Sequence, residues 1–242
     1  MSKLRVLVAA AGRGTRAGLP YPKTLFPIQG KAILIRIAEL MAPYDAQMTI
    51  IVSPEGEAQI RRALADAGLV AHLVVQPAPS GMGDAVLQFE QSPAFDSAEH
   101  VLLVWGDIPF IQPSTVEAVV NAHLAHGNDF TFATRMVDSA YTLVARDVNG
   151  VVAGVVESRE LGIKDPKAGE REIGLFAYRP KIVHEALRAE HADKLGKTTG
   201  EHGFLYVIGH LASAGRKVEA LPVATELDLV SLNSLADVAD FV

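Results

Sequence analysis

The chain has 242 residues, no cysteine and a formal net charge of −6, so it can bury one large core without disulfides, and thiolate metal sites and cysteine nucleophiles are excluded. Its acidic balance argues against a nucleic-acid surface, which draws on clustered Lys and Arg. No apolar run approaches the roughly 20 residues that span a bilayer, and we expect a soluble, cytoplasmic protein without nucleic-acid or membrane partners.

The first half of the chain repeats a strand and helix unit. Short apolar runs rich in Val, Leu and Ile alternate with amphipathic stretches, which is typical of a mostly parallel sheet covered by helices. The expected strands are 4–10, 48–53, 70–76 and 101–105. The expected helices are 32–41, 57–67, 83–91 and 114–126, the last with a capping box in the sequence STVE.

Shorter strands follow after about residue 128. They are DFTFATRM, YTLVARD, GVVAGVVES and EIGLFAYRP, with DVNG as a hairpin turn. Helices are expected over 182–189 and in GFLYVIGHLASAG, where Gly215 ends the helix, and a last strand in RKVEALPV. No linker, repeat or low-complexity segment interrupts the chain. We predict an α/β fold with a Rossmann-like, mostly parallel mixed sheet flanked by helices, in a single domain of residues 1–242.

The stretch AAGRGTRAGLPYPKTL, residues 10–25, follows the first expected strand. A glycine-rich turn there places backbone N–H groups at the carboxyl edge of the sheet, where open α/β sheets bind ligands. It carries Arg13, Arg16 and Lys23 with no acid between them. Prolines between positions 20 and 27 prevent the helix that a dinucleotide fingerprint needs, and no Walker A sequence follows. The stretch predicts a phosphate site; the alternative is an ordinary turn with solvated arginines.

Two further motifs are expected at the same edge. In VWGDIPF, Asp107 follows a hydrophobic strand, which favours a hard-cation ligand, although a turn or helix-capping role is the alternative. In QPAPSGMGDA, the amide of Gln76 precedes a second glycine turn. That amide could read the edge of a nucleobase with its donor and acceptor, or it could tie the loop to its own backbone.

Together these motifs resemble the sugar-phosphate nucleotidyltransferase (NTP transferase) family, and most of all the pyrophosphorylase domains of bacterial N-acetylglucosamine-1-phosphate uridylyltransferases. In that family AAG-x-G-T-R is followed, seven residues after its arginine, by a Pro-Lys lysine, and Lys23 stands at that spacing from Arg16. The family's glutamine, glycine turn and Gly-Asp pair match Gln76, SGMGDA and Gly106-Asp107.

The second half matches the family more loosely. YTLVARDVNGVVAGVVESREL is similar to the strand pair R-x-D-x-G-x-V-x-x-I-V-E and aligns Glu157 with its glutamate, while SLNSLADVADF aligns Asn233 with a metal-binding asparagine. The family's Gly-Tyr-Gly is Ala-Tyr-Thr in this chain, so Thr142 places a Cβ where the family's glycine lets the sugar approach the backbone. The family's I-N-T-G is Glu-Ile-Gly-Leu in this chain, around Gly174. Alternatively, Glu157 is a solvated strand residue beside Arg159, and Asn233 is the N-cap of the helix that follows it.

The resemblance implies an Mg²⁺-dependent enzyme that joins a nucleoside triphosphate to a sugar 1-phosphate, gives an NDP-sugar and releases pyrophosphate. In it, Arg16 would brace the leaving group and Lys23 would bridge the α-phosphate and the incoming phosphate. The implied set is catalytic Arg16, Lys23 and Asp107; nucleotide-binding Ala10, Gly12, Arg13, Gly14, Thr15, Gln76, Gly81, Met82, Trp105 and Gly106; acceptor-binding Thr142, Glu157 and Gly174; and Mg²⁺-binding Asp107 and Asn233. Residues from 1 to about 127 would form the nucleotide half and the rest the acceptor half.

Alternatives to a sugar nucleotidyltransferase stay open. The altered acceptor motifs fit a nucleotidyltransferase for choline phosphate, methylerythritol phosphate or molybdopterin, and a non-catalytic protein of the same fold would only bind nucleotide. A glycosyltransferase with a nucleotide-sugar donor is disfavoured, because such enzymes show Asp-x-Asp and WGDIPF supplies one acid. The motifs specify neither the base nor an oligomeric state.

Overall fold

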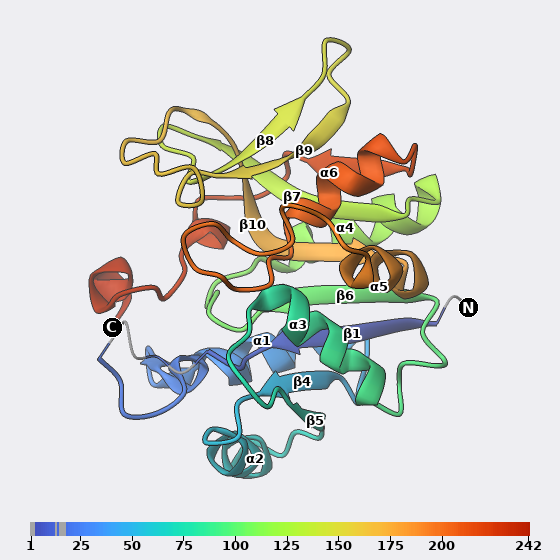
Figure 1. The fold of residues 1–242 in the computed structure, drawn as a ribbon. Helices are drawn as coiled ribbons and strands as arrows, with labels where there is room; N and C mark the ends of the chain where they lie inside the picture. Colours follow the sequence, from blue (N-terminus) through green and yellow to red (C-terminus); the bar gives the residue numbers. More distant parts are fainter. Residues whose placement is uncertain (1–2, 13, 15–17) are drawn as a thin grey trace.

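The computed structural model describes residues 3–12, 14 and 18–242, and its centre is a seven-stranded mixed sheet (Figure 1). The strand order is β11-β7-β10-β6-β1-β4-β5. The strands are β1 (Leu4–Ala9), β4 (Thr49–Val52), β5 (His72–Val75), β6 (His100–Trp105), β7 (Phe130–Val137), β10 (Gly169–Tyr178) and β11 (Val218–Leu221). Only β10 runs antiparallel to its neighbours in this sheet, so the predicted mostly parallel mixed sheet is confirmed.

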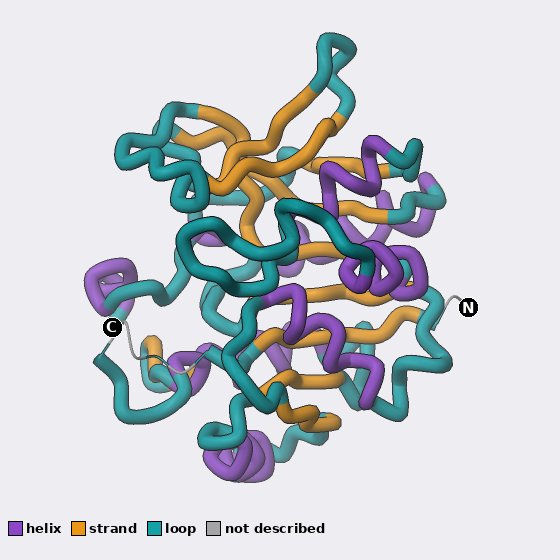
Figure 2. Tube along the Cα trace, viewed as in Figure 1, coloured by secondary structure: helices purple, strands orange, loops and turns teal. Residues whose placement is uncertain are grey.

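The parallel strands bring the predicted motifs to one edge. In the register, Ala9 at the end of β1 lies between Ile51 of β4 and Trp105 of β6, so the loops that follow these strands start side by side. Because β10 runs in the opposite direction, its amino end meets the carboxyl ends of its neighbours. Figure 2 shows loops gathered along this edge. The sheet therefore places segments from both halves of the chain near one another.

Helices cover both faces of the sheet because successive strand side chains point to opposite sides. In β1, Val6 and Val8 belong to one buried cluster, and Leu7 between them belongs to the other. The first cluster includes residues of α1 (Ile33–Met41), α2 (Glu57–Asp66) and α4 (Pro113–His126), and the second includes residues of α3 (Met82–Leu87), α5 (Pro180–Arg188) and α6 (Tyr206–Ser213). Figure 1 shows α3 and α5 in front of the sheet. Both faces of the strands are apolar for this reason.

Smaller elements complete the chain. A hairpin of β8 (Thr142–Arg146) and β9 (Val152–Glu157) packs on α6 and β10, and its predicted turn is confirmed, since the amide of Gly150 donates to the carbonyl of Asp147. The remaining elements are β2 (Pro27–Ile28), β3 (Lys31–Ala32) and the 3₁₀ helices η2 (Lys23–Leu25), η3 (Gln88–Gln91), η4 (Leu227–Leu229) and η5 (Leu235–Phe241). No helix among the described residues is both long and apolar enough to cross a membrane.

The helix ends correct one prediction and confirm another. The predicted STVE capping box is wrong: α4 starts at Pro113, its N-cap Gln112 makes no side-chain cap bond, and the hydroxyl of Thr115 donates to Asp228 instead. Proline at the first helical position moves the start one residue upstream. Gly215 ends α6 as predicted, with a φ of +72°. The expected helix over 83–91 is α3 followed directly by the 3₁₀ helix η3.

Candidate functional site

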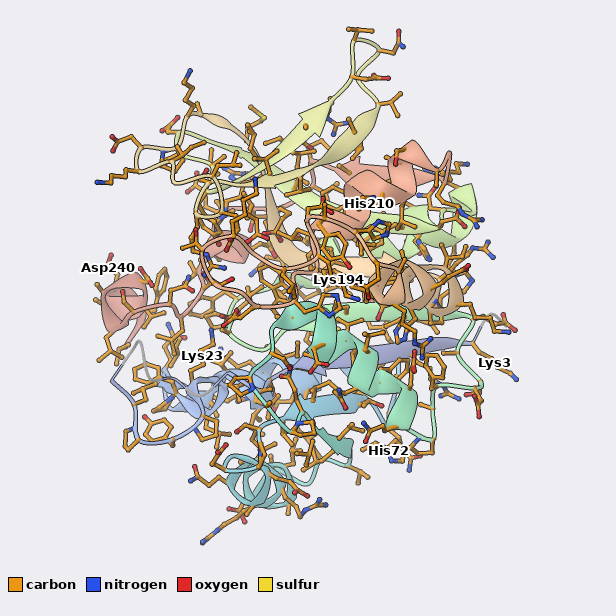
Figure 3. All side chains as sticks on the ribbon, in the orientation of Figure 1. Lys3, Lys23, His72, Lys194, His210 and Asp240 are labelled. Carbon is orange, nitrogen blue, oxygen red and sulfur yellow. The ribbon has the colours of Figure 1, made fainter. Side chains whose placement is uncertain are left out.

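Two of the predicted catalytic residues meet at the carboxyl edge of the sheet. Lys23 begins η2, directly after the buried Pro22, and Asp107 follows the last residue of β6 by two positions. The ammonium group of Lys23 donates to Oδ2 of Asp107 and forms an ion pair with it. Both side chains are largely buried, with exposed fractions of 20% and 13%. Figure 3 shows Lys23 on the side of the molecule away from the N-terminus of β1.

Two glycines permit this close approach. A Cβ at Gly12 would lie 2.8 Å from Cε of Lys23, and a Cβ at Gly106 would lie 2.8 Å from the carbonyl oxygen of Ala9. The backbone is fixed there as well, because the amide of Gly106 donates to that same carbonyl at 2.9 Å. A side chain at position 106 would meet the backbone at the end of β1, and one at position 12 would displace the ammonium end of Lys23. The predicted roles of Arg13, Thr15 and Arg16 fall outside the described residues; Ala10 and Gly14, which the structure does describe, flank them.

Asp107 has the features expected of a cation ligand. Its Oδ1 atom is buried and has no hydrogen-bond partner, while its backbone carbonyl accepts the amide of Leu232 at 2.9 Å. This bond brings the neighbouring Asn233 to the same edge, where its Nδ2 donates to Oγ of Ser231 at 3.0 Å. One unpaired carboxylate oxygen and one side-chain amide fit Mg²⁺, which keeps most of its ligands as water and phosphate oxygens. The described residues contain no group of three or more His, Cys, Asp or Glu that could hold a metal ion.

Ser234, not Asn233, caps the C-terminal helix η5. The side chain of Ser234 accepts the amide of Asp237, and the carboxylate of Asp237 accepts the amide of Ser234 at 2.6 Å. The alternative interpretation of Asn233 as the N-cap is therefore wrong. Its metal-binding role stays a prediction.

Gln76 is buried just after β5 and holds the second glycine turn. Its Nε2 donates to the carbonyl of Gly81 and to Oδ2 of Asp84, both at 3.0 Å. Both hydrogens of the amide nitrogen are thus used, one by the backbone of the turn, as the alternative interpretation expected, and one by a side chain of α3. A base that used this amide as a donor would have to replace one of these bonds.

The glycine turn itself is covered by a distant segment. The amide of Gly83 donates to the carbonyl of His202 at 3.0 Å, and the amide of His202 donates to the carbonyl of Ser80 at 2.7 Å. A Cβ at Gly81 would lie 2.3 Å from the carbonyl oxygen of His202. Gly81 also has a φ of +111°, and the adjacent Met82 begins α3. No pattern in the sequence predicted that the segment before α6 contacts this turn.

Glu172, which the sequence interpretation did not assign, connects two of the predicted acceptor residues. Its carboxylate accepts the hydroxyl of Thr142 at 3.1 Å and the backbone amide of Gly174 at 2.6 Å, and the residue has no exposed surface. Burial raises the pKa of Glu172 to about 7, and the Gly174 amide, Arg171 and the Thr142 hydroxyl offset only part of this effect. The signal was present in the sequence as the acid of Glu-Ile-Gly, where the family pattern has I-N-T-G.

Gly174 also joins the acceptor half to the end of β6. It has a φ of +79° at a bulge of β10, and a Cβ there would lie 2.8 Å from Cε3 of Trp105 and 2.6 Å from Cδ1 of Ile108. Trp105 packs on Phe176 with ring centroids 5.6 Å apart. A side chain at position 174 would displace the indole of Trp105, the residue that directly precedes the Gly-Asp pair in the sequence.

Glu157 lies at the end of β9, opposite Thr142 in the hairpin register. Its side chain is 29% exposed and forms an ion pair with Arg159, with 3.9 Å between Nη2 and Oε2. Partial burial raises the pKa of Glu157, while Arg159 opposes that shift. The residue is therefore half-buried beside Arg159, and its role in acceptor binding stays a prediction.

Comparisons with known proteins show the family to which the chain belongs. A family model for MobA-like NTP transferase domains matches residues 6–204. The bifunctional protein GlmU of Kineococcus radiotolerans is 30% identical over 97% of this chain and 48% of its own length, and that of Streptomyces avermitilis is 27% identical over 99% and 50%. The chain thus spans about half the length of the curated relatives it matches.

A solved structure shows the same fold. The crystal structure of a Bacillus anthracis protein assigned as a glucose-1-phosphate thymidylyltransferase, in complex with sucrose, superposes with a TM-score of 0.70 at 16% sequence identity. The match covers 90% of this chain and 85% of that one. The predicted resemblance to nucleotidyltransferases is confirmed, and the chain belongs to the family of MobA-like NTP transferase domains.

Proposed function

We propose that the protein is an Mg²⁺-dependent nucleotidyltransferase that joins a nucleoside triphosphate to a phosphorylated small molecule, with a sugar 1-phosphate as the first candidate. The observation that carries the proposal is the pairing of Lys23, from the glycine-rich loop, with Asp107, whose second oxygen is buried and unpartnered. Family membership and the GlmU relatives support this reaction class. The localisation proposed with it is cytoplasmic.

The reaction exchanges one phosphoanhydride bond for another. An oxygen of the acceptor phosphate attacks the α-phosphorus of the triphosphate, the new P–O bond forms, and the bond to the β-phosphate breaks, so that pyrophosphate leaves with the electron pair. The attacking oxygen is already anionic near neutral pH, so no general base is needed. Such a reaction needs orientation and charge compensation more than covalent help.

The residues of the edge supply these two needs. Lys23 follows the buried Pro22 at the start of η2, so the backbone presents this cation at the edge of the sheet, where it would bind phosphate oxygens. Asp107 and Asn233 would hold Mg²⁺, which when bound neutralises phosphate charge. In the ligand-free protein the ammonium of Lys23 and the carboxylate of Asp107 neutralise each other, and triphosphate binding would draw Lys23 to the phosphates.

A second candidate is a nucleotidyltransferase for an acceptor other than a sugar 1-phosphate. The specific observation is at Thr142, which has a side chain where the family pattern has glycine and directs its hydroxyl to the buried Glu172. A sugar ring that approaches the backbone at this position would meet the Cβ of Thr142. This candidate keeps the same nucleotide half and the same chemistry.

Pyrophosphate release tests both candidates. The purified protein with Mg²⁺ is assayed over a grid of the four NTPs and dTTP against sugar 1-phosphates, choline phosphate and methylerythritol phosphate. Release that depends on one pair supports the proposal and names both substrates. No release from any pair, with nucleotide binding confirmed by calorimetry, would contradict both acceptor candidates and favour a nucleotide-binding protein. If nucleotide binding is absent too, the opening loop is only a turn.

A further inference from the structure

Arg171 stands at the edge of the sheet in the acceptor half. It lies near the amino end of β10, opposite Arg135 of β7 in the register, and precedes the buried Glu172. The amino end of β10 reaches the edge at which β6 ends in the Gly-Asp pair. No predicted role involves Arg171.

The guanidinium of Arg171 is held by an aromatic ring and, among the described residues, not by an ion pair, although its charge acts on the carboxyl of Glu172. Its Cζ lies 3.9 Å from the centre of the Tyr141 ring, and its Nη2 donates to the Tyr141 hydroxyl. Its Nε is buried without a hydrogen-bond partner, and no carboxylate among the described residues forms an ion pair with it. By contrast, Arg135 donates to Glu226 at 3.0 Å and Arg146 donates to Glu170 at 2.7 Å. A buried, unpaired N–H on a cation is costly until an acceptor completes its bonding, and the oxygens of an anion are strong acceptors for a cation.

The stacked pair also lies within electrostatic reach of the metal-ligand candidate. The pKa of Tyr141 is raised to about 12, first because its hydroxyl is withdrawn from water, then because the carboxylates of Glu172 and, more weakly, Asp107 lie nearby. Arg171 opposes this shift. Tyr141 is 40% exposed, and its hydroxyl accepts the hydrogen bond from Arg171.

We propose that Arg171 binds the phosphate group of the acceptor, an inference that rests on the proposed function. The reaction brings two phosphate compounds together, and in the opening loop only Lys23 is implied to reach the incoming phosphate as well as the triphosphate. A planar guanidinium offers several fixed N–H donors to phosphate oxygens. Stacking on Tyr141 fixes its plane before the acceptor arrives, so little side-chain entropy is lost on binding. The acceptor half thus contributes a phosphate-binding cation of its own.

NMR of the arginine Nε–H groups tests binding directly. The protein is labelled with ¹⁵N-arginine, and the peak of Arg171 is assigned by its loss in Arg171→Met. Inorganic phosphate, glucose 1-phosphate and choline phosphate are titrated, each with and without a non-hydrolysable triphosphate and Mg²⁺. We expect the Arg171 peak to move with a phosphate compound while the peak of Arg135, paired with Glu226, stays in place.

Steady-state kinetics give the second readout, with the productive pair found by pyrophosphate release. Arg171→Met is expected to raise the acceptor KM roughly 10- to 100-fold, the equivalent of losing a charge-assisted hydrogen bond, and to leave the KM for the triphosphate unchanged. Arg171→Lys should restore part of the acceptor affinity, because lysine keeps the positive charge but lacks the planar set of guanidinium N–H donors. Arg135→Met, the matched control on the facing strand, should change neither constant.

The outcomes separate this proposal from the function it rests on. An Arg171 peak that no phosphate compound moves, with or without the triphosphate analogue, overturns the role of Arg171, and so does an unchanged acceptor KM in folded Arg171→Met. If the peak moves and no substrate pair releases pyrophosphate, the phosphate site holds and the transferase function fails.

Discussion

The buried carboxyl of Glu172 makes the stability of this protein depend on pH, and Glu172→Gln should remove that dependence. Glutamine keeps the size of the side chain and an oxygen that accepts the Gly174 amide, but it carries no charge at any pH. The substitution also alters hydrogen bonds, which changes the free energy of unfolding by an amount that does not vary with pH. Only the part of the difference that varies with pH reports the ionisation of Glu172.

The size of the effect follows from the shifted pKa. The pKa of Glu172 is about 7 in the folded protein instead of 4.5, chiefly because of burial. Between these values the unfolded chain has released the proton while the native protein retains it, so the native state loses stability as pH rises. A shift of this size corresponds to about 3 kcal/mol across the window. The advantage of Glu172→Gln should therefore grow by about 3 kcal/mol from pH 4.5 to 7 and then level off.

Urea denaturation at half-unit steps from pH 4.5 to 8.5 measures this difference for both proteins. Glu226→Gln, at an exposed carboxylate on the surface, is the control for charge removal and should not reproduce the growth. Thr142→Val removes a hydrogen bond that favours the charged form of Glu172 and should move the end of the window to higher pH. A difference between wild type and Glu172→Gln that stays flat across the range would refute the burial of an ionisable carboxyl at this position.

Three further predictions test the edge of the sheet. Lys23→Met should raise the affinity of the nucleotide-free protein for Mn²⁺, measured by electron paramagnetic resonance, because it releases the Asp107 carboxylate from its ion pair. Turnover should fall by orders of magnitude, while the urea midpoint changes little. Unchanged Mn²⁺ binding would mean that the ion pair does not compete with the metal. Asp107→Ala should abolish the response of turnover to Mg²⁺, and an intact metal titration would reassign the residue to a turn. Gly83→Ala should destabilise the protein by about 1–3 kcal/mol in urea, because its Cβ would lie 2.1 Å from the carbonyl oxygen of Gly203. Equal loss in Gly127→Ala, which has open space and only a φ of +64° to strain it, would show that the close contact carries no cost.

Local patterns predicted most of the fold. The apolar runs around Val6 and Leu103 are strands because both faces are covered, and the amphipathic stretches between them are helices, as periodicity indicates. The helix start at Pro113 was missed because a capping box and an N-terminal proline compete for the same positions, and only the contact of Thr115 with Asp228 decides between them. Element type follows from short-range pattern, whereas an exact boundary depends on a partner 113 residues away.

The candidate site divides in the same way. The sequence by itself determined which loops leave the carboxyl edge and which of them carry cations, carboxylates and glycines, because strand direction and loop chemistry are local properties. Tertiary structure alone decided that Lys23 pairs with Asp107, that Gly81 packs under His202, and that Thr142 directs its hydroxyl to Glu172. Thr142 and Glu172 are 30 positions apart in the sequence, and Gly81 and His202 are 121 positions apart. No spacing rule covers such pairs, since they exist only once the sheet has brought its two halves together.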